Sequence, residues 1–473
     1  MDHRQPPPHF LKEWVEALIS SSTIDIQKIN KEKKMDKITL DVLKEACKAG
    51  GPSCLTSRTE LAPAAGPEAA VAPAKFVVKQ GRDNVSTYSY ERRYIDGEEY
   101  NTVLIDSKQS QLNRMEGALV RAIEDGHSIL TKIPRVVVQY ERNDITERYS
   151  DLELPHRVFD GHIRAGTIQV DGQEQTVTQT EWYRAIRDAT PSNARALLDA
   201  SPATLIFGGW DSSRKARQGR WRSLLVGEII GVIGVYAANV VNNPSKKGGA
   251  RIDPVGMQVK LPGEVLKSLA DTQKDELSPE TYNKIIKSAE SKELISASNL
   301  GLGGIPPTLD TLAGVACKRI IRAHVFSFAA LRQIRFGFND GNSDGNVACR
   351  VLLAALALNA LARSDSELFL RANCDLVEKG EPVVTIDFRY GKYQEFQPLS
   401  IEEADNLLER AIKYAEDQTD IKWTDEPKLV QVQGNPKIIT GAVDEGSEEE
   451  NNEDTSNTTN TVDSTESSDE DDL

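Results

Sequence analysis

Residues 203–222 read A-T-L-I-F-G-G-W-D-S-S-R-K-A-R-Q-G-R-W-R and join an apolar run, a double glycine and a basic segment. We expect the apolar run at 204–207 to be a buried strand, because short apolar runs bounded by glycine are typical of one. Five cations stand in the nine residues of the basic segment, 214–222: Arg214, Lys215, Arg217, Arg220 and Arg222. Guanidinium groups fork onto phosphate oxygens, and Trp210 or Trp221 offers a flat face to a base. The stretch therefore predicts contact with a polyphosphate chain, and a solvated charge run at a helix entrance is the alternative.

The acidic net charge of −15 is concentrated at the end of the chain. Residues 441–473 hold thirteen Asp or Glu and no Lys or Arg, so the other residues carry a charge of only −2. Residues 201–260 hold nine Lys or Arg against three Asp or Glu, and we expect an anionic partner there. The acidic tail has almost no apolar side chains, so we expect residues 426–473 to be disordered. Solvation is its default role, and competition with nucleic acid for the basic segment is the alternative.

The cysteines and apolar runs indicate the compartment. Five cysteines follow no metal-ligand spacing, and an odd, sparse count is typical of reduced thiols. The first residues form no signal peptide, and the longest apolar run, at 351–358, is too short to cross a bilayer. We therefore expect a soluble cytoplasmic protein with no membrane partner, no cofactor and no metal.

Hydrophobic periodicity predicts helices and strands in mixed order. The expected helices span residues 40–46, 107–123, 181–188, 192–199, 224–230, 343–363 and 401–416. The expected strands and extended segments span residues 87–95, 102–105, 135–140, 156–168, 204–207, 232–241, 368–374 and 383–388, with a hairpin turn at Asp96-Gly97. Residues 50–74, rich in Pro, Gly and Ala, are expected to form an irregular loop. This mixture predicts an α+β fold built on an antiparallel sheet with large insertions.

The chain divides into three parts. Residues 1–34 are expected to be an amphipathic or disordered extension, because the apolar pairs Phe10-Leu11, Trp14-Val15 and Leu18-Ile19 recur at helical spacing. Residues 35–425 are expected to form the folded domain, and the acidic tail follows it.

The sequence offers little for catalysis, so we expect a binding protein with no catalytic residues. His156 and His162 would share one face of a strand with Asp160, but no further His or Cys cluster completes a metal site. The glycine cluster at 301–307 ends in two prolines, which exclude the helix that a phosphate-binding loop needs. The motifs of acyl transfer and of nucleotide hydrolysis are absent from the sequence.

Eight segments, taken together and in order, resemble a known family. Four are S-R-T-E-L-A-P-A-A-G-P (57–67), L-P-H-R-V-F-D-G-H-I-R (154–164), L-I-F-G-G-W-D-S-S-R (205–214) and G-L-G-G-I-P-P (301–307). The others are residues 106–116, 249–255, 326–336 and 371–376. They look like the CRISPR-associated RAMP superfamily protein of type I-G systems, formerly I-U, which is the Cas seven-type backbone subunit of the Cascade interference complex. The resemblance spans roughly residues 36–420.

The resemblance implies an RRM-like (ferredoxin-like) antiparallel sheet palm with large thumb and finger insertions. It also implies that several copies assemble as a filament along one CRISPR RNA (crRNA), beside the large subunit and the Cas five/six-type subunit of Cascade. The guide then reads target DNA through the heteroduplex, and another subunit processes the precursor RNA. The chain departs from the family in its first 34 residues, in its acidic tail and at R-A-N-C-D-L (371–376), where Asn373 is expected to keep a left-handed turn.

A subunit that accepts any guide sequence needs contacts to phosphates and 2′-hydroxyls rather than to base edges. The five cations of the basic segment are the first candidates. Further RNA-binding candidates carry a polar head or a flat ring: Gln109, Asn113, Arg114, His156, Arg157, Arg164 and Trp210. Capping and solvation are the alternative for those of the 107–123 helix, and a packed hinge position is the alternative for Trp210. Arg319, Arg322 and His324 either line the same groove or border a strand.

Two other functions stay open at this point. One is a metal-independent endoribonuclease of the same superfamily that processes precursor CRISPR RNA, with a histidine as general base on a 2′-hydroxyl. The other is a scaffold whose acidic tail contacts protein partners.

Overall fold

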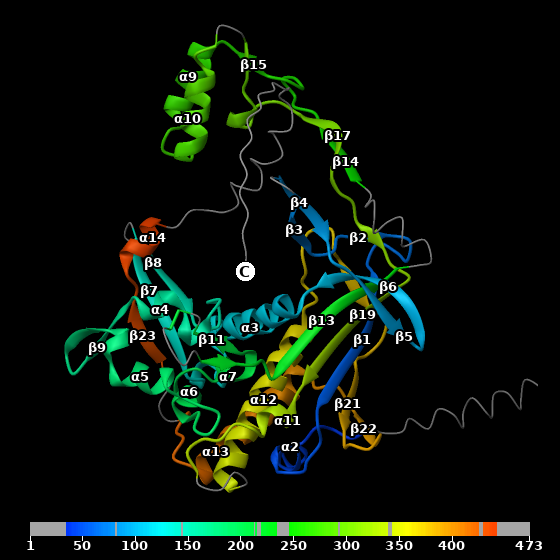
Figure 1. Ribbon diagram of the computed structural model, residues 1–473, viewed down its shortest axis with the longest axis vertical. Helices are drawn as coiled ribbons and strands as arrows, with labels where there is room; N and C mark the ends of the chain where they lie inside the picture. The colour runs from blue at the N-terminus through cyan, green and yellow to red at the C-terminus, as the bar shows by residue number, and fades with distance from the viewer. Residues whose placement is uncertain are drawn as a thin grey trace, which may run out of the picture.

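An eight-stranded antiparallel sheet forms the centre of the protein (Figure 1). The computed structural model describes residues 35–80, 83–142, 145–211, 213–214, 219–233, 246–291, 294–338, 343–424 and 429–441. In sheet order the strands are β22 (Tyr393–Phe396), β21 (Val383–Asp387), β1 (Leu55–Pro63), β19 (Arg319–Phe326), β13 (Leu225–Val232), β6 (Glu98–Asp106) and β5 (Tyr90–Ile95), and β20 (Leu376–Glu378) pairs with β1 beyond β21.

The middle of this sheet has the ferredoxin-like arrangement. In chain order the elements are β1, α3 (Lys108–Glu124), β13, β19, α12 (Asp344–Ser366) and β21, while in the sheet the order is β21-β1-β19-β13. The two helices contact each other, and their apolar side chains share one core cluster with Leu55, Phe326 and Ile386 of the strands. The expected α+β class and RRM-like palm are therefore confirmed.

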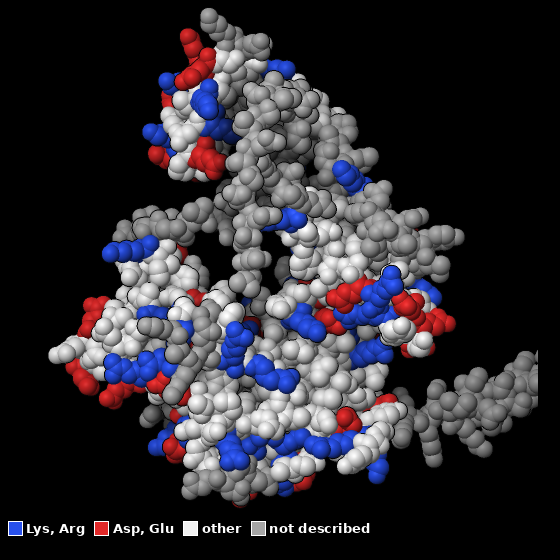
Figure 2. Space-filling model, viewed as in Figure 1, with Lys and Arg blue, Asp and Glu red and all other residues white. Residues whose placement is uncertain are grey.

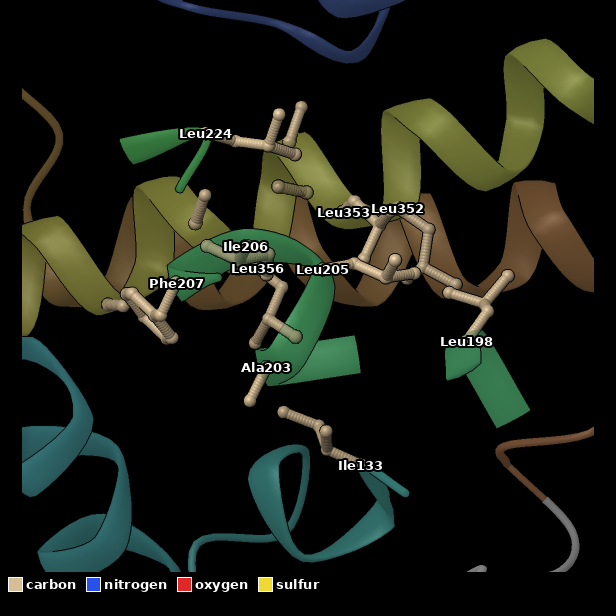
Figure 3. Close-up of a cluster of buried hydrophobic side chains, with 14 of the residues drawn as sticks. Ile133, Leu198, Ala203, Leu205, Ile206, Phe207, Leu224, Leu352, Leu353 and Leu356 are labelled. Atoms are coloured by element: carbon tan, nitrogen blue, oxygen red, sulfur yellow. The ribbon is translucent and has the colours of Figure 1, made fainter. Parts of the chain in front are cut away.

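Helix α12 is the centre of the core, because it is buried on nearly every side from Gly345 to Arg363. It contacts α13 (Ile401–Gln418), α3, α2 (Leu40–Cys47) and α7 (Pro202–Phe207). Figure 3 shows Leu205 and Ile206 of α7 against the leucines of α12, among them Leu356. By length and composition α12 could cross a membrane, but 94% of its apolar window is buried inside the protein, as in a core helix.

Large insertions extend from the palm. A five-stranded sheet, β10-β9-β23-β7-β8, contains the expected strand at 135–140 as β7 (Arg135–Arg142). The insertion between β13 and β19 forms an arm that projects from the sheet in Figure 1. Its ribbon pairs β14 (Lys246–Arg251) with β17 (Ile305–Leu312), and the chain between these two strands forms the helices α9 (Gly263–Thr272) and α10 (Pro279–Ser288). A small core of its own, including Leu266 and Ile285, holds the two helices of the arm together.

The other strands of the insertions are short. They are β2 (Ala70–Val71) paired with β18 (Val315–Ala316), β3 (Lys75–Gln80) paired with β4 (Asp83–Tyr88), β8 (Ile145–Ser150), β9 (Thr167–Val170), β10 (Gln173–Thr176), β11 (Gly209–Trp210) paired with β12 (Arg220–Trp221), β15 (Lys260–Leu261) paired with β16 (Ile295–Ser296), and β23 (Leu429–Gln433). Short helices complete them: α4 (Gly161–Arg164), α5 (Glu181–Arg187), α6 (Arg195–Ala200), α11 (Phe328–Leu331) and α14 (Pro436–Gly441).

Several expected elements are confirmed. The hairpin at Asp96-Gly97 joins β5 to β6, and Ser107 caps α3 by accepting the N–H of Ser110. The 40–46, 343–363 and 401–416 helices are present as α2, α12 and α13, and Asn373 has the left-handed φ of 60°. The extended segment predicted at 232–241 is described only through residue 233, and residues 234–241 lie outside the described part.

The two elements on either side of the basic segment were each assigned the wrong type of secondary structure: the predicted strand is a helix, and the predicted helix is a strand. Residues 204–207 are helical in α7, because Ser201 caps the helix, Pro202 occupies its first turn and Gly208, with φ of 93°, ends it. Residues 224–230 fall in strand β13, where Val226 and its neighbours pair with β19. Both runs are apolar and short, so their periodicity could not separate helix from strand.

Four further expectations were wrong. The predicted strand at 156–168 is a 3-10 turn followed by α4, since the Asp160 carboxylate caps α4 by accepting the N–H of His162. The predicted loop at 50–74 contains β1 and β2, and the predicted strand at 368–374 has no strand pairing. Strand β23 and helix α14 lie within 426–473, so the expected boundary of the tail is too early.

His324 joins β19 to α3 within the core. Its ring is 2% exposed, and Nε2 donates to Gln111 Oε1 at 3.0 Å. Gly227 on β13 faces the ring, and a Cβ there would lie 2.0 Å from His324 Cδ2, so only glycine leaves room for it. His324 is a core residue and does not line a groove.

Burial, helped by the Arg322 charge, lowers the pKa of His324 to about 3. The unfolded chain therefore binds a proton at this residue below about pH 6.5, whereas the folded chain does not until about pH 3, so stability falls as the pH falls through this window. We expect this residue to remove up to about 1.4 kcal/mol of unfolding free energy per pH unit, and His324→Gln to abolish that component. Urea unfolding between about pH 7.5 and 5.0 measures it, and equal pH dependence in both proteins would contradict the assignment.

Candidate nucleic-acid interface

A cleft of about 770 Å³ lies where α3, the 152–157 loop, the α7–β11 turn and the start of β13 meet. Several predicted RNA-binding residues from distant parts of the chain line it: Gln109, Asn113, His156, Arg157 and Trp210. Figure 2 shows Lys and Arg side chains across the area in which Figure 1 places α3, α7 and β11. The structure thus brings part of the predicted set together around one concave surface.

One wall of the cleft is a polar face of α3. Lys108, Gln109 and Asn113 are exposed along it, and Leu112 lies between them at its base. Residues three and four apart lie on one side of a helix, so the capped first turns of α3 bring Gln109 and Asn113 together, with Lys108 beside Gln109. Lys108 was missed in the sequence, and its position next to Gln109 was the available signal.

The opposite wall is the short ribbon of β11 and β12, which pair antiparallel. Trp210 is 43% exposed, and the Arg220 guanidinium lies over its ring at 4.7 Å from the centroid. Trp221, half-buried, also lines the cleft. The ribbon therefore places two indoles at the cleft, one of them with a stacked guanidinium.

The double glycine is required by close packing. Gly208 has a φ of 93°, and a Cβ on Gly209 would lie 2.7 Å from Thr204 Cγ2. Any other residue at either position would strain the backbone or displace α7. The turn thus fixes where Trp210 leaves the core.

Arg157 has a structural role in the cleft, because its guanidinium is held by groups of the same chain. Its Nε and Nη2 donate to both carboxylate oxygens of Glu116 at 2.5 and 2.7 Å, and Nη1 donates to Gly208 O at 3.0 Å. The Glu116 side chain is 3% exposed and that of Arg157 is 12% exposed. Burial raises the pKa of Glu116, and the Arg157 guanidinium opposes that rise. This pair ties α3 to the glycine turn.

Other predicted arginines are also held by carboxylates of the same chain. Arg114 pairs with Asp106 at 3.0 Å, Arg164 pairs with Asp211 at 3.4 Å, and Arg214 pairs with Asp188 at 2.6 Å. Arg187 and Arg214 lower the pKa of Asp188 to about 2. Phosphate contacts by these arginines would have to compete with their present partners.

Around the cleft, three described cations stay available for phosphate contacts: Lys108, Arg220 and Arg222. All three are exposed, and none forms an ion pair within the part of the chain that the structure describes. Lys215 and Arg217 lie outside the described residues.

The remaining candidates lie elsewhere. Arg319 pairs with Glu60 and Asp96, whereas Arg322 is 2% exposed and lies in the core beside His324. His162 Nδ1 hydrogen-bonds Tyr140 Oη at 2.7 Å, so the strand face shared with His156 does not exist. Across the described ranges, no group of three His, Cys, Asp or Glu could hold a metal ion.

We expect Arg157→Ala to lower the free energy of unfolding by about 3–5 kcal/mol, because it leaves the Glu116 carboxylate buried without a partner. Arg222→Ala, an exposed cation from the same region, is the matched control and should change stability by less than about 0.5 kcal/mol. Chemical denaturation followed by circular dichroism measures both. Similar small losses in both variants would show that Arg157 does not hold the cleft together.

Comparison with known proteins adds an independent finding. Residues 55–235 match the model of a family described as CRISPR-associated protein GSU0053, and this range contains every residue that lines the cleft. No curated protein matches the chain. The crystal structure of Thermofilum pendens Csc2 is similar at a TM-score of 0.23 and 10% sequence identity, over 81% of this chain and 84% of that chain, and a likeness this low carries no argument.

Proposed function

We propose that this chain, a CRISPR-associated protein of the RAMP class, is the backbone subunit of a type I-G Cascade complex and holds crRNA in the cleft. The family match supports the CRISPR context. The ferredoxin-like palm with its insertions supplies a frame of the kind that RRM-type proteins use for single-stranded RNA. In the proposed complex, several copies follow one guide, and the guide pairs with target DNA.

The observation that carries this proposal is the composition of the cleft. Its lining offers the cation of Lys108, the amides of Gln109 and Asn113, and the rings of Trp210 and Trp221, and the exposed Arg220 stacks on Trp210. Cations bind phosphates of any sequence, and indole rings stack on any base. Such a cleft suits a subunit that must hold every guide equally well.

The proposal includes no chemistry by this chain. Cleavage of precursor RNA would need a general base near a 2′-hydroxyl, and His156 is the histidine that lines the cleft. We place the protein in the cytoplasm, together with the large subunit and the Cas five/six-type subunit.

The triple variant Lys108→Ala, Arg220→Ala, Arg222→Ala should weaken RNA binding by at least about tenfold and reduce the slope of log affinity against log salt by about 2, since three phosphate contacts are lost. The loss should be the same for unrelated guide sequences. Filter binding with two guides at several salt concentrations measures it.

The matched control replaces three exposed cations on and after α13: Arg410→Ala, Lys413→Ala and Lys422→Ala. It changes the net charge equally, so it should leave both affinity and salt slope close to those of the wild type. A loss confined to one guide, or an equal loss in the control, would argue against phosphate recognition in the cleft.

The purified chain should leave precursor CRISPR RNA intact, with or without divalent metal ions. Incubation with end-labelled RNA followed by gel electrophoresis tests this. Specific cleavage that disappears in His156→Ala would replace the present proposal by the endoribonuclease function.

A further inference from the structure

A second cavity, of about 560 Å³, lies between the C-terminal half of α12, the start of β1 and the N-terminus of α13. Its walls are mainly apolar, with Leu358 and Leu361 from α12, Val384 from β21 and Leu399 and Ile401 next to α13. None of its lining residues lines the RNA cleft. We call it the α12 groove.

The α12 groove contains one buried carboxylate oxygen without a hydrogen bond. Asp365 lines it, and the buried Asp365 Oδ1 accepts no hydrogen bond. The nearest cation, Arg322 Nη2, is 3.4 Å away, and the Arg322 Nε also has no hydrogen-bond partner. A buried carboxylate oxygen without a hydrogen bond costs free energy even beside a cation, so the groove suits an occupant with an apolar body and one N–H donor.

The chain enters its described part at the rim of this groove. Asp36 O accepts the N–H of Gln397, and Lys37 Nζ lies 2.5 Å from Glu403 Oε1 on α13. Ile38, two residues after Asp36, lines the groove itself. Residues 1–34 therefore join the described part of the chain beside an apolar surface.

The sequence of that extension offers apolar side chains and an N–H donor, which are the groups that would fill the groove. Phe10, Trp14 and Leu18 are spaced by four, and Leu11, Val15 and Ile19 follow each of them. This spacing gives one apolar stripe on a helix, about 15 Å long for ten residues. The Trp14 side chain combines a large apolar ring with an N–H donor.

The chain between Trp14 and the described part is long enough to let Trp14 reach the α12 groove. Twenty residues lie between Trp14 and Met35, and a chain of that length can span any distance up to about 65–70 Å. A segment tethered so close to its binding surface binds intramolecularly at a high effective concentration.

We propose that residues 10–19 of this chain pack into the α12 groove of the same molecule, with the indole of Trp14 as the anchor and Asp365 Oδ1 as the acceptor of its N–H. The extension then closes the apolar surface between α12, β1 and α13. This inference is independent of the RNA cleft and of the proposed function.

Stability of the full-length chain gives the first test. Trp14→Ala should lower the melting temperature by about 2–4 °C, whereas Glu13→Ala, on a different side of the same segment, should leave it unchanged. Trp14→Phe keeps the ring and removes the donor, so its shift should lie between the two. An unchanged melting temperature for Trp14→Ala would overturn the proposal, and equal values for the wild type and Trp14→Phe would overturn the role of Asp365.

Photo-crosslinking locates the segment directly. With p-benzoylphenylalanine at position 14 of the full-length protein, irradiation and mass spectrometry should identify crosslinks to residues 358–366 or 398–402 within a monomer band. The same crosslinker at position 13 should give at most a fraction of that yield. Crosslinks in a dimer band would assign the groove to a second copy, and crosslinks elsewhere, or none, would likewise overturn the intramolecular contact.

Discussion

The burial of α12 is the constraint on which the rest of the structure depends. This helix is apolar on nearly all sides, so it must be covered on all sides to leave water. The palm sheet, α2, α3, α7 and α13 provide that cover. Because α7 has to lie on α12, the chain must turn sharply at Gly208-Gly209, and this turn delivers Trp210 to the cleft. The polar surface that we assign to RNA is thus positioned by apolar contacts beneath it.

The arginines of this region divide between two roles according to how far each lies from water. Arg157 reaches the core and is held there by Glu116, since a buried guanidinium is tolerated only with a partner. Arg164 and Arg214 bridge loops through Asp211 and Asp188. Arg220 and Arg222 sit on a two-stranded ribbon at the surface, where no packing demands an ion pair. A run of cations in a sequence therefore mixes structural and binding residues, and only their surroundings separate them.

The two cavities differ in the polarity of the side chains that line them. The RNA cleft presents exposed cations, amides and indoles, and it accepts a charged chain that stays partly hydrated. The α12 groove presents aliphatic side chains and one unsatisfied carboxylate oxygen, and it accepts an apolar segment with a single donor. Each surface is complementary to a different part of the assembly that we propose, the guide RNA in one case and the chain's own extension in the other.

The sequence alone determined the class of the fold, the long helices and the general region of the candidate site, because these depend on periodicity and composition. The 343–363 and 401–416 helices, the Ser107 cap, the turn at Asp96-Gly97 and the backbone of Asn373 were all predictable from local chemistry. The short apolar runs on either side of the basic segment were assigned in reverse, since burial on all sides removes the periodicity that separates helix from strand. Only the tertiary structure decided which cations remain available for phosphates: it brought Glu116 to Arg157 and Asp188 to Arg214 from distant positions, and such long-range pairings leave no local signal in the chain.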